Sequence, residues 1–303
     1  MKYEHVCTNS DRQTIIRVAG LPAPVTLLHL TDSHMNASDL TEGVEALAES
    51  IRLYNFDALD TQTRFDRALA YANDLQADAV VLTGDIVNGA TAGNLSLLDK
   101  RLSSLRVPYL YTPGNHDWEY PGRSWGEATR AEQYPKFEPL MAGDPSFQTL
   151  EIGGIQLVAV DNSTYQISEA QLAAFEQALS RGLPTLLFMH IPIYVPSLLP
   201  DVVRVWGSPI MMAAQGWDAN LMKQWQVEPA GMETLAFYEL LMDNPQGNLI
   251  GVFCGHVHFA HDDAFGRGSR QYVTAAGLDG GYRVIRLLPA RESDGPAETA
   301  VHA

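Results

Sequence analysis

Five short clusters of residues that can bind metal ions recur along the chain, and each follows an apolar run. The clusters are Thr31-Asp32-Ser33-His34, Thr83-Gly84-Asp85, Gly114-Asn115-His116-Asp117, Met189-His190 and Cys254-Gly255-His256-Val257-His258. Carboxylate, imidazole and amide-oxygen ligands suit divalent ions such as Mn, Fe or Zn. Asp32 and His34 occupy alternate positions, as do His256 and His258, so each pair should lie on one side of an extended segment. We interpret the clusters as one site with two metal ions.

The apolar runs that precede these clusters predict buried strands. The runs are Val25–Leu30, Ala79–Leu82, Val107–Tyr111, Thr185–Met189 and Leu249–Phe253. Loops at strand ends are held by a rigid frame, and an open sheet binds its ligands there. The five clusters should therefore converge.

The remaining periodic segments predict helices and further strands. Helices are expected around Phe65–Leu75, 94–104 and Leu235–Met242, and after the capping box of Ser168 and Gln171. Phe147–Ile152 and Ile155–Val160, joined by Gly153-Gly154, predict a hairpin, and strands are expected near 270–275 and 282–288. Strands alternate with helices at first and hairpins follow, which predicts an α/β (α+β) fold with a mixed sheet system flanked by helices.

Two segments are expected to be insertions. Within about 36–60, Leu40, Val44, Leu47 and Ile51 have helical spacing, and the segment either packs on the body or forms a rim of the site. Residues 194–231 are rich in Pro, Trp and Met and show no clear period. So long a loop is usually functional or disordered, and its large side chains argue against disorder. The segment forms either a lid over the site or a loop packed on the surface of the domain.

Bulk properties exclude several classes of protein. The 303 residues are 46% hydrophobic, which suits a single domain over 1–303. The net charge of -16, without a Lys/Arg run, disfavours a long nucleic acid as partner. No run approaches the ~20 apolar residues of a membrane span, and the first 21 residues are polar and mixed, without the apolar core of a secretory signal. With only Cys7 and Cys254, a disulfide framework and a four-thiolate zinc site are excluded, and a cytoplasmic location is expected.

The ordered set D-x-H, G-D, G-N-H-D, H and G-H-x-H resembles that of the calcineurin-like metallophosphoesterase family. The resemblance implies a four-layer α-β-β-α sandwich and hydrolysis of a small phosphate ester at two divalent ions. It implies that one ion is held by Asp32, His34, Asp85 and His258, and the other by Asp85, Asn115, His190 and His256. It further implies that His116 acts on the phosphate as general acid or charge stabiliser, and that Asp117 orients His116 by a hydrogen bond.

Several alternatives remain open at this stage. A phosphodiesterase and a phosphomonoesterase need the same two ions, and a catalytically silent scaffold that binds a partner protein through its metal face is a different class. Asn88 either contacts the site or belongs to a turn. His29 is expected to be a hydrogen-bonded core residue, and His261 with Asp262 and Asp263 a solvated turn.

Overall fold

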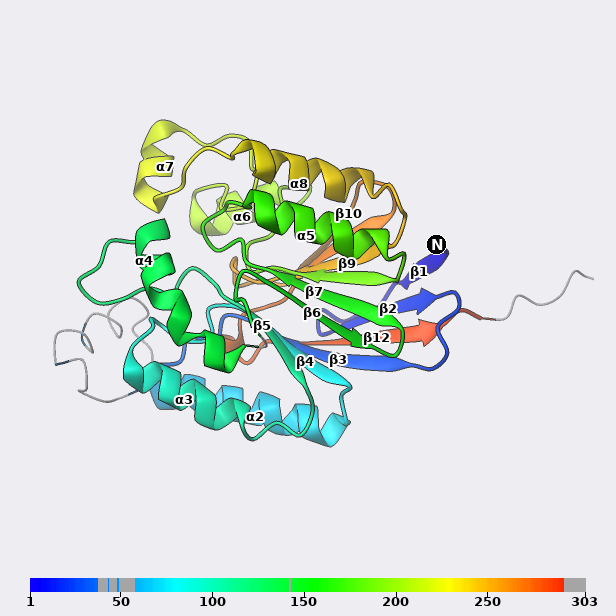
Figure 1. Ribbon diagram of the computed structural model, residues 1–303, viewed down its shortest axis with the longest axis horizontal. Coiled ribbons are helices and arrows are strands. Elements are labelled where there is room, and N and C mark those ends of the chain that lie inside the picture. The colour runs from blue at the N-terminus through cyan, green and yellow to red at the C-terminus, as the bar shows by residue number, and fades with distance from the viewer. Residues whose placement is uncertain (38–42, 44–47, 49–57, 142, 292–303) are drawn as a thin grey trace, which may run out of the picture.

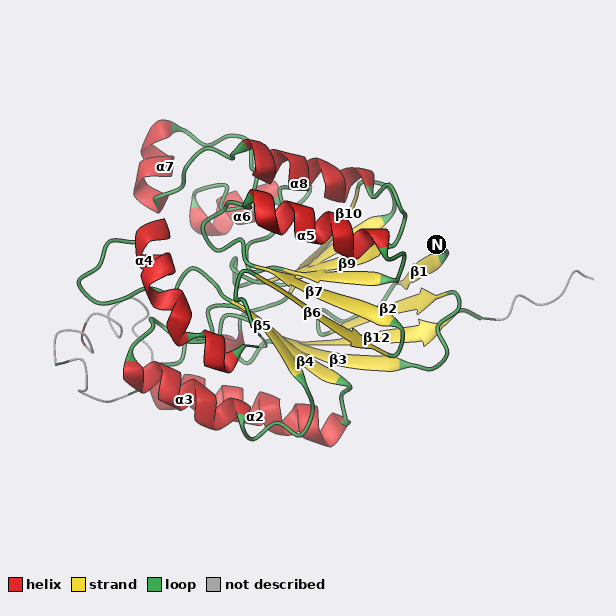
Figure 2. Cartoon of the chain, in the orientation of Figure 1, coloured by secondary structure: helices red, strands yellow, loops and turns green. Residues whose placement is uncertain are grey.

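Two six-stranded sheets pack face to face, with helices on both outer sides, in the computed structural model of the chain (Figure 1). The structure describes residues 1–37, 43, 48, 58–141 and 143–291. The expected four-layer arrangement is present, with helices below and above the strands in the view of Figure 2.

The first sheet has the order β1-β2-β12-β3-β4-β5. Its strands are β1 (Tyr3–Val6), β2 (Gln13–Val18), β12 (Arg283–Pro289), β3 (Val25–Leu30), β4 (Ala79–Thr83) and β5 (Tyr109–Thr112). β3, β4 and β5 are parallel, so their carboxyl ends lie at the same edge.

The second sheet has the order β10-β11-β9-β8-β7-β6. Its strands are β10 (His261–Phe265), β11 (Ser269–Val273), β9 (Leu249–Cys254), β8 (Thr185–Phe188), β7 (Ile155–Val160) and β6 (Phe147–Ile152). β7, β8 and β9 are parallel, which gives this sheet its own set of three aligned carboxyl ends. β6 and β7 form the expected hairpin, with positive φ at Gly153 and Gly154.

The helices divide between the two outer faces. α2 (Ala58–Leu75) and α3 (Ala92–Leu102) lie along the first sheet, and α5 (Glu169–Ser180) and α8 (Met232–Asp243) lie along the second (Figure 1). The other helical segments of the described residues are α4 (Glu127–Gln133), α6 (Leu199–Trp206), α7 (Ala219–Trp225) and the 3₁₀ turns η1 (Tyr134–Lys136), η2 (Glu138–Leu140) and η3 (Gly277–Asp279).

Alternation along the strands builds three apolar layers. In β4, Val80 and Leu82 join the layer under α2 and α3, whereas Ala79 and Val81 face the second sheet. In β7, Val158 and Val160 pack under α5 and α8, and Leu157 and Ala159 face the first sheet. Strands buried on both faces read as continuous apolar runs, which is why the sequence predicts them well.

Most predicted elements are present. The capping box of Ser168 and Gln171 starts α5, and His29 is buried with a hydroxyl partner on each ring nitrogen. The solvated turn predicted at His261 is wrong, because this residue begins β10, where its Nδ1 lies 2.9 Å from Asp263 Oδ2.

Two further segments are more regular than their sequences indicate. The polar N-terminal stretch contributes β1 and β2, and residues 194–231 contain α6 and α7. The four residues whose helical spacing predicts a helix within about 36–60 lie outside the described residues; they are Leu40, Val44, Leu47 and Ile51. Among described helices, none has the length and apolar character needed to cross a membrane.

Candidate metal centre

The carboxyl ends of the two parallel strand triplets meet at one end of the sandwich. Asp32 and His34 follow β3, Asp85 follows β4, and Asn115 and His116 follow β5. His190 follows β8, and His256 and His258 follow β9. Each of the seven predicted ligands thus leaves the end of a strand, as the sequence indicates.

These side chains form two compact groups that could each hold a metal ion. Asp32, His34 and His258 form one group, and Asp85, His190 and His256 form the other, with the ligand atoms of each group within 4.8 Å of one another. The Nε2 atoms of His34 and His258 lie 3.2 Å apart. Two nitrogens bound at about 2.1 Å to one ion at a right angle would be separated by about 3 Å. The first group therefore fits a shared cation.

Asp85 lies between the two groups. Its Oδ2 atom is 3.1 Å from Nε2 of His190 in its own group and 3.9 Å from Nε2 of His34 in the other. Asn115 adds an amide oxygen to the second group, because its Oδ1 atom is 3.1 Å from Nε2 of His190. A carboxylate in this position can serve two ions at once.

The backbone turns sharply at the ligands. Asp32, His34, Asp85, His256 and His258 all have positive φ, between 47° and 69°. The left-handed region is uncommon for residues with a side chain, although Asp and His tolerate it better than most. The alternate-residue argument for an extended segment is therefore wrong in its geometry. Asp32 and His34 reach one group because the chain turns at each of them.

Glycines allow the strand ends to approach each other. A Cβ atom on Gly114 would lie 2.2 Å from Asp85 Oδ1, and one on Gly255 would lie 1.9 Å from Thr31 Oγ1 and 2.3 Å from Asp32 Oδ2. The backbone N–H of His256 donates to Asp32 Oδ2 over 2.9 Å. The glycines of these clusters thus bring the ends of β3 and β9, and of β4 and β5, into contact.

Three histidines of these two groups are fixed through one ring nitrogen, which leaves the other to face the group. Nδ1 of His34 lies 2.7 Å from Asn88 Oδ1, and Nδ1 of His190 lies 2.7 Å from the carbonyl oxygen of Thr83. Nε2 of His256 lies 2.9 Å from the hydroxyl of Tyr165. Partners of this kind set the tautomer and orientation of metal-binding imidazoles. Asn88, for which the sequence left a contact or a turn open, makes the contact.

Burial and charge agree with a cation in this site. Burial lowers the pKa of His34 to about 3 and the pKa of His256 well below its usual value, so both rings are neutral at pH 7 and offer a lone pair. Burial alone would lower the pKa of His190, but Asp85 raises it to about 9. Asp85 thus draws a positive charge to this position, and a divalent ion can supply it in place of the proton.

The role expected of Asp117 is not the one the structure gives it. Its carboxylate accepts hydrogen bonds from the backbone N–H groups of Asp85, Ile86, Val87 and Gly114. Asp117 therefore braces the loop after β4. Glu119 takes the predicted position instead, with its Oε2 atom 3.0 Å from Nδ1 of His116. Burial alone would lower the pKa of His116, but Glu119 and Asp85 raise it to about 9.

A pocket of about 300 Å³ opens over the two groups. Its lining includes Asp85, His116, His256 and His258, together with an aromatic and apolar wall. That wall consists of Trp125, Tyr165, Trp206, Ile210 and Trp225. Trp206 stands edge-on to the His258 ring at 5.3 Å, and its indole N–H donates to the carbonyl oxygen of Val257.

Sequence reasoning missed Glu119 and Tyr165. Glu119 lies three residues after His116, a spacing that can place two side chains together in a turn, so a local signal existed. Tyr165 lies 91 residues from its partner His256, and no pattern in the sequence connects them.

The fold and the site together define a two-sheet α-β-β-α protein with paired metal-binding groups at the strand ends. A sequence model described as calcineurin-like phosphoesterase matches residues 25–260, well over half of the chain. The chain belongs to the calcineurin-like phosphoesterase family.

Two curated relatives are phosphodiesterases by name. A glycerophosphodiester phosphodiesterase of Enterobacter lignolyticus is 27% identical over 177 residues, 55% of this chain and 56% of that protein. A probable cyclic nucleotide phosphodiesterase of Rhodopseudomonas palustris is 28% identical over 192 residues, 58% of this chain and 61% of that protein. The match thus spans less than two thirds of each relative.

Solved structures share the fold at lower identity. A dimetal phosphatase of Danio rerio superposes with a TM-score of 0.50 and 11% identity, over 86% of this chain and 91% of that one. A purple acid phosphatase from yellow lupin (Lupinus luteus) seeds gives a TM-score of 0.50 and 14% identity, over 93% of this chain and 48% of that one.

Proposed function

We propose that the protein hydrolyses a small phosphate ester, with a phosphodiester preferred over a monoester, using two divalent ions. The observation that carries this proposal is the pair of ligand groups joined through Asp85 beneath a pocket that His116 also lines. Asp32, His34, Asp85 and His258 would hold one ion. Asp85, Asn115, His190 and His256 would hold the other.

Divalent ions bound there would act as Lewis acids on the phosphoryl group and make a water molecule more acidic. The protein's own groups prepare the reaction. Glu119 holds Nδ1 of His116, and the backbone N–H of His116 donates to Asp85 Oδ1 over 2.8 Å, so the ring is fixed beside the ligand groups. We assign to His116 the stabilisation of the phosphoryl group or proton donation to the leaving oxygen.

Two observations favour a diester. Both curated relatives are named as phosphodiesterases. The wall of Trp125, Trp206 and Trp225 lies beside the ligand groups, and such a surface suits an ester group more than a free, strongly hydrated phosphoryl oxygen.

Hydrolysis of model esters tests the proposal. The protein is loaded in turn with Mn, Fe, Zn and Mg and assayed with bis-p-nitrophenyl phosphate and p-nitrophenyl phosphate. We expect the diester to give the higher kcat/KM, and Asp85→Ala to lose both metal and activity. His116→Ala should keep its metal and lose roughly 10²–10⁴-fold in rate.

Each contrary result has a defined meaning. A higher kcat/KM for the monoester would make the protein a phosphomonoesterase with the same site. Loss of metal in His116→Ala would place this histidine among the ligands. If the metal-loaded protein cleaves neither ester, the proposal of an enzyme is refuted. The alternative that remains is a catalytically silent scaffold that binds a partner protein.

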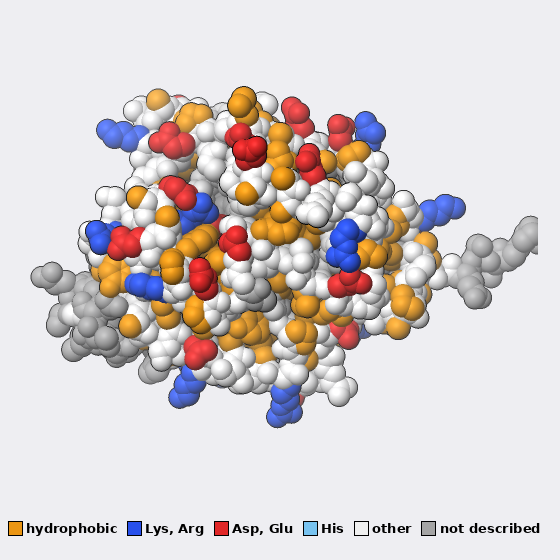
Figure 3. Space-filling model, viewed as in Figure 1, with side chains coloured by type: hydrophobic (Ala, Val, Ile, Leu, Met, Phe, Trp, Pro, Cys, Tyr) orange, Lys and Arg blue, Asp and Glu red, His pale blue; other side chains and the backbone are white. Residues whose placement is uncertain are grey.

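We further propose a cytoplasmic location and a small-molecule substrate. Cys7 is exposed and Cys254 is buried at the end of β9, and neither is in a disulfide, which suits a reducing compartment. On the face shown in Figure 3, acidic and basic side chains are scattered without a basic cluster, which does not favour binding of a long nucleic acid.

A further inference from the structure

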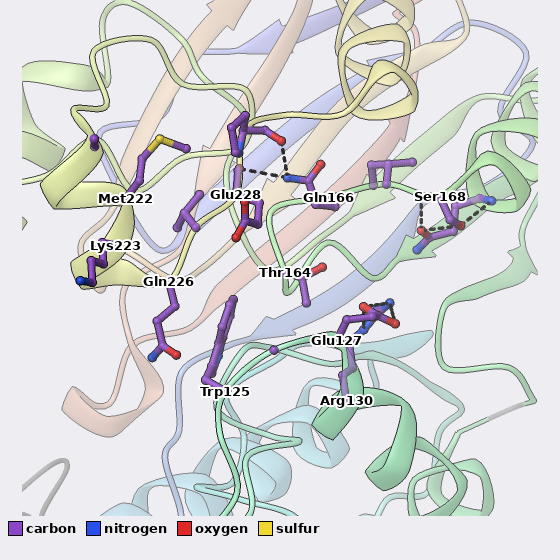
Figure 4. A pocket seen from close by; sticks show the side chains of 16 residues that line it. Trp125, Glu127, Arg130, Thr164, Gln166, Ser168, Met222, Lys223, Gln226 and Glu228 are labelled. Atoms are coloured by element: carbon purple, nitrogen blue, oxygen red, sulfur yellow. Dashed lines mark hydrogen bonds and ion pairs between the residues drawn. The ribbon is translucent and has the colours of Figure 1, made fainter.

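A second, larger cavity adjoins the pocket over the ligand groups. It is a groove of about 900 Å³ between α4, the loop around Thr164–Ser168 and the end of α7 (Figure 4). In Figure 4, Trp125 and Arg130 lie on one side and Met222 and Lys223 on the other. Ligand pockets of roughly 300–1,000 Å³ accommodate whole drug-sized molecules, so this groove is large enough for a substantial chemical group.

The groove borders the pocket over the ligand groups. Trp125 and Gln226 line both cavities, so a molecule with its phosphate at the ligand groups can extend past these two side chains into the groove. Gln226 ends α7 with a φ of 55°, and its backbone N–H bonds to the carbonyl oxygen of Lys223. The indole of Trp125 and the side-chain amide of Gln226 thus lie at the boundary between the groove and the pocket.

The groove is held in shape by contacts behind its walls. Trp125 packs on buried Trp118 at 5.3 Å between ring centroids, and the Trp118 indole N–H donates to Ser163 Oγ. Arg130 forms an ion pair with Asp161, which attaches α4 to the end of β7, and a second ion pair with Glu127 within α4. A preformed cavity does not spend binding free energy on ordering its walls.

The charges of the lining cancel. Glu127 and Glu228 oppose Arg130 and Lys223, and the guanidinium of Arg130 is already paired with carboxylates. With two acidic and two basic side chains in its lining, the groove offers no net positive charge to a second anionic group. The apolar surface of Trp125 and Val227, with the Gln226 amide, instead suits a bulky uncharged group that has a flat face and can hydrogen-bond.

We propose that this groove binds one alcohol group of an asymmetric phosphodiester, a group that is large, uncharged and flat enough to lie on Trp125. This inference rests on the proposed phosphodiesterase function and adds its substrate class. Trp125 is then the residue that determines which diesters are preferred, since it borders both the reacting phosphate and the group bound in the groove.

Two diesters with the same leaving group test the inference. Methyl p-nitrophenyl phosphate has a compact second alcohol, and the p-nitrophenyl ester of thymidine 5′-phosphate has a bulky neutral one. Release of p-nitrophenolate is measured for both with metal-loaded protein. We expect kcat/KM to be roughly tenfold higher for the thymidine ester, the size of one stacking interaction.

Substitutions then locate the preference. Trp125→Ala should bring the ratio of the two kcat/KM values close to one. Ala219→Trp, at the exposed first residue of α7 in the groove, should lower the ratio by obstruction. Ala70→Trp, at an exposed position of α2 away from the groove, is the matched control and should leave the ratio unchanged.

A binding measurement separates the inference from the chemistry. Thymidine alone should bind metal-free wild-type protein saturably and weakly, and Trp125→Ala should lose this binding. Equal kcat/KM values for the two diesters, with no thymidine binding, would refute the proposed role of the groove. The proposed phosphodiesterase function would still stand. Thymidine binding without turnover of either diester would refute the proposed function and show that the groove binds such a group independently.

Discussion

A buried imidazole in this site is oriented by a hydrogen-bond partner on the ring nitrogen that faces away from the other ligand residues. Nδ1 of His256 lies 3.2 Å from Nε2 of His190, and its Nε2 atom lies 2.9 Å from the Tyr165 hydroxyl. Tyr165 is itself buried, has a φ of 64° and is edge-on to the His256 ring. A residue held in a sparsely populated conformation beside a ligand indicates a positioning role.

We expect Tyr165→Phe to weaken binding of one of the two ions. The substitution keeps the ring and removes the hydroxyl that lies 2.9 Å from Nε2 of His256, and loss of such a partner typically costs 10–100-fold in metal affinity. Titration of the chelated protein with Mn, followed by calorimetry, should show one site weakened by that factor and the other little changed.

Tyr238→Phe is the matched control for that substitution. Tyr238 donates to the carbonyl oxygen of Tyr194 over 3.0 Å, so the control also removes one hydrogen bond, in α8 and away from the ligands. Equal affinities in both variants would mean that Tyr165 contributes packing only.

The residue scale also shows where sequence reasoning stops. The positions of the proposed ligands are predictable because each follows an apolar strand, and a strand end fixes where a side chain begins. The partner of His116 is not predictable in this way, because the turn after Asn115 decides which carboxylate reaches Nδ1 of His116. Asp117 points to four backbone N–H groups, and Glu119 reaches the ring. Adjacency in sequence does not predict contact in a turn.

At the scale of elements, burial on both faces separates the predictable strands from the others. β4 and β9 are buried throughout and read as apolar runs. β2 alternates between buried and partly exposed residues, and β10 starts with His261-Asp262-Asp263, so both look like polar loops. They form because neighbouring strands complete their hydrogen bonds, which a local reading of the sequence does not show.

The contact between the β4 and β5 ends leaves no room for a single added atom. In Gly114→Ala, the added Cβ would lie 2.2 Å from Asp85 Oδ1, so the carboxylate proposed to serve both ions must move. We expect this variant to lose metal at both sites in elemental analysis after gel filtration, and to be destabilised by roughly 1–3 kcal/mol in urea unfolding.

A second glycine provides the comparison. A Cβ at Gly231 would meet its nearest neighbour, Gln166 Oε1, at 3.5 Å, which is ordinary contact. Gly231→Ala should therefore keep its full metal content. If Gly114→Ala also keeps both ions, the close approach of the two strand ends does not determine the position of Asp85.

At the scale of the whole molecule, the two sheets enclose a polar residue in their shared core. His29 on β3 is fully buried, with Nδ1 2.9 Å from Thr274 Oγ1 and Nε2 2.7 Å from Thr83 Oγ1. Its ring packs edge-on against Phe188 and Phe253 of the opposite sheet. A charge on this ring would be desolvated between two sheets and would face the Arg283 guanidinium.

Burial, helped by Arg283, lowers the pKa of His29 to about 3, whereas an unfolded histidine titrates near 6.5. Between these values the unfolded chain binds a proton that the folded chain does not. The free energy of unfolding should therefore fall as the pH drops from 6.5 towards 3, by about 1.4 kcal/mol per pH unit for this one group. Above pH 6.5 the group contributes no pH dependence.

Urea unfolding of chelated wild type and His29→Gln at pH 7, 6 and 5 isolates this contribution, because other titrating groups are common to both proteins. Glutamine can still donate and accept one hydrogen bond but takes up no proton. We expect the variant to be less stable at pH 7 and the difference to shrink steadily towards pH 5, as the wild type alone loses the His29 contribution. A difference that stays constant would mean that His29 is protonated in the folded protein, and that the space between the sheets tolerates a charge.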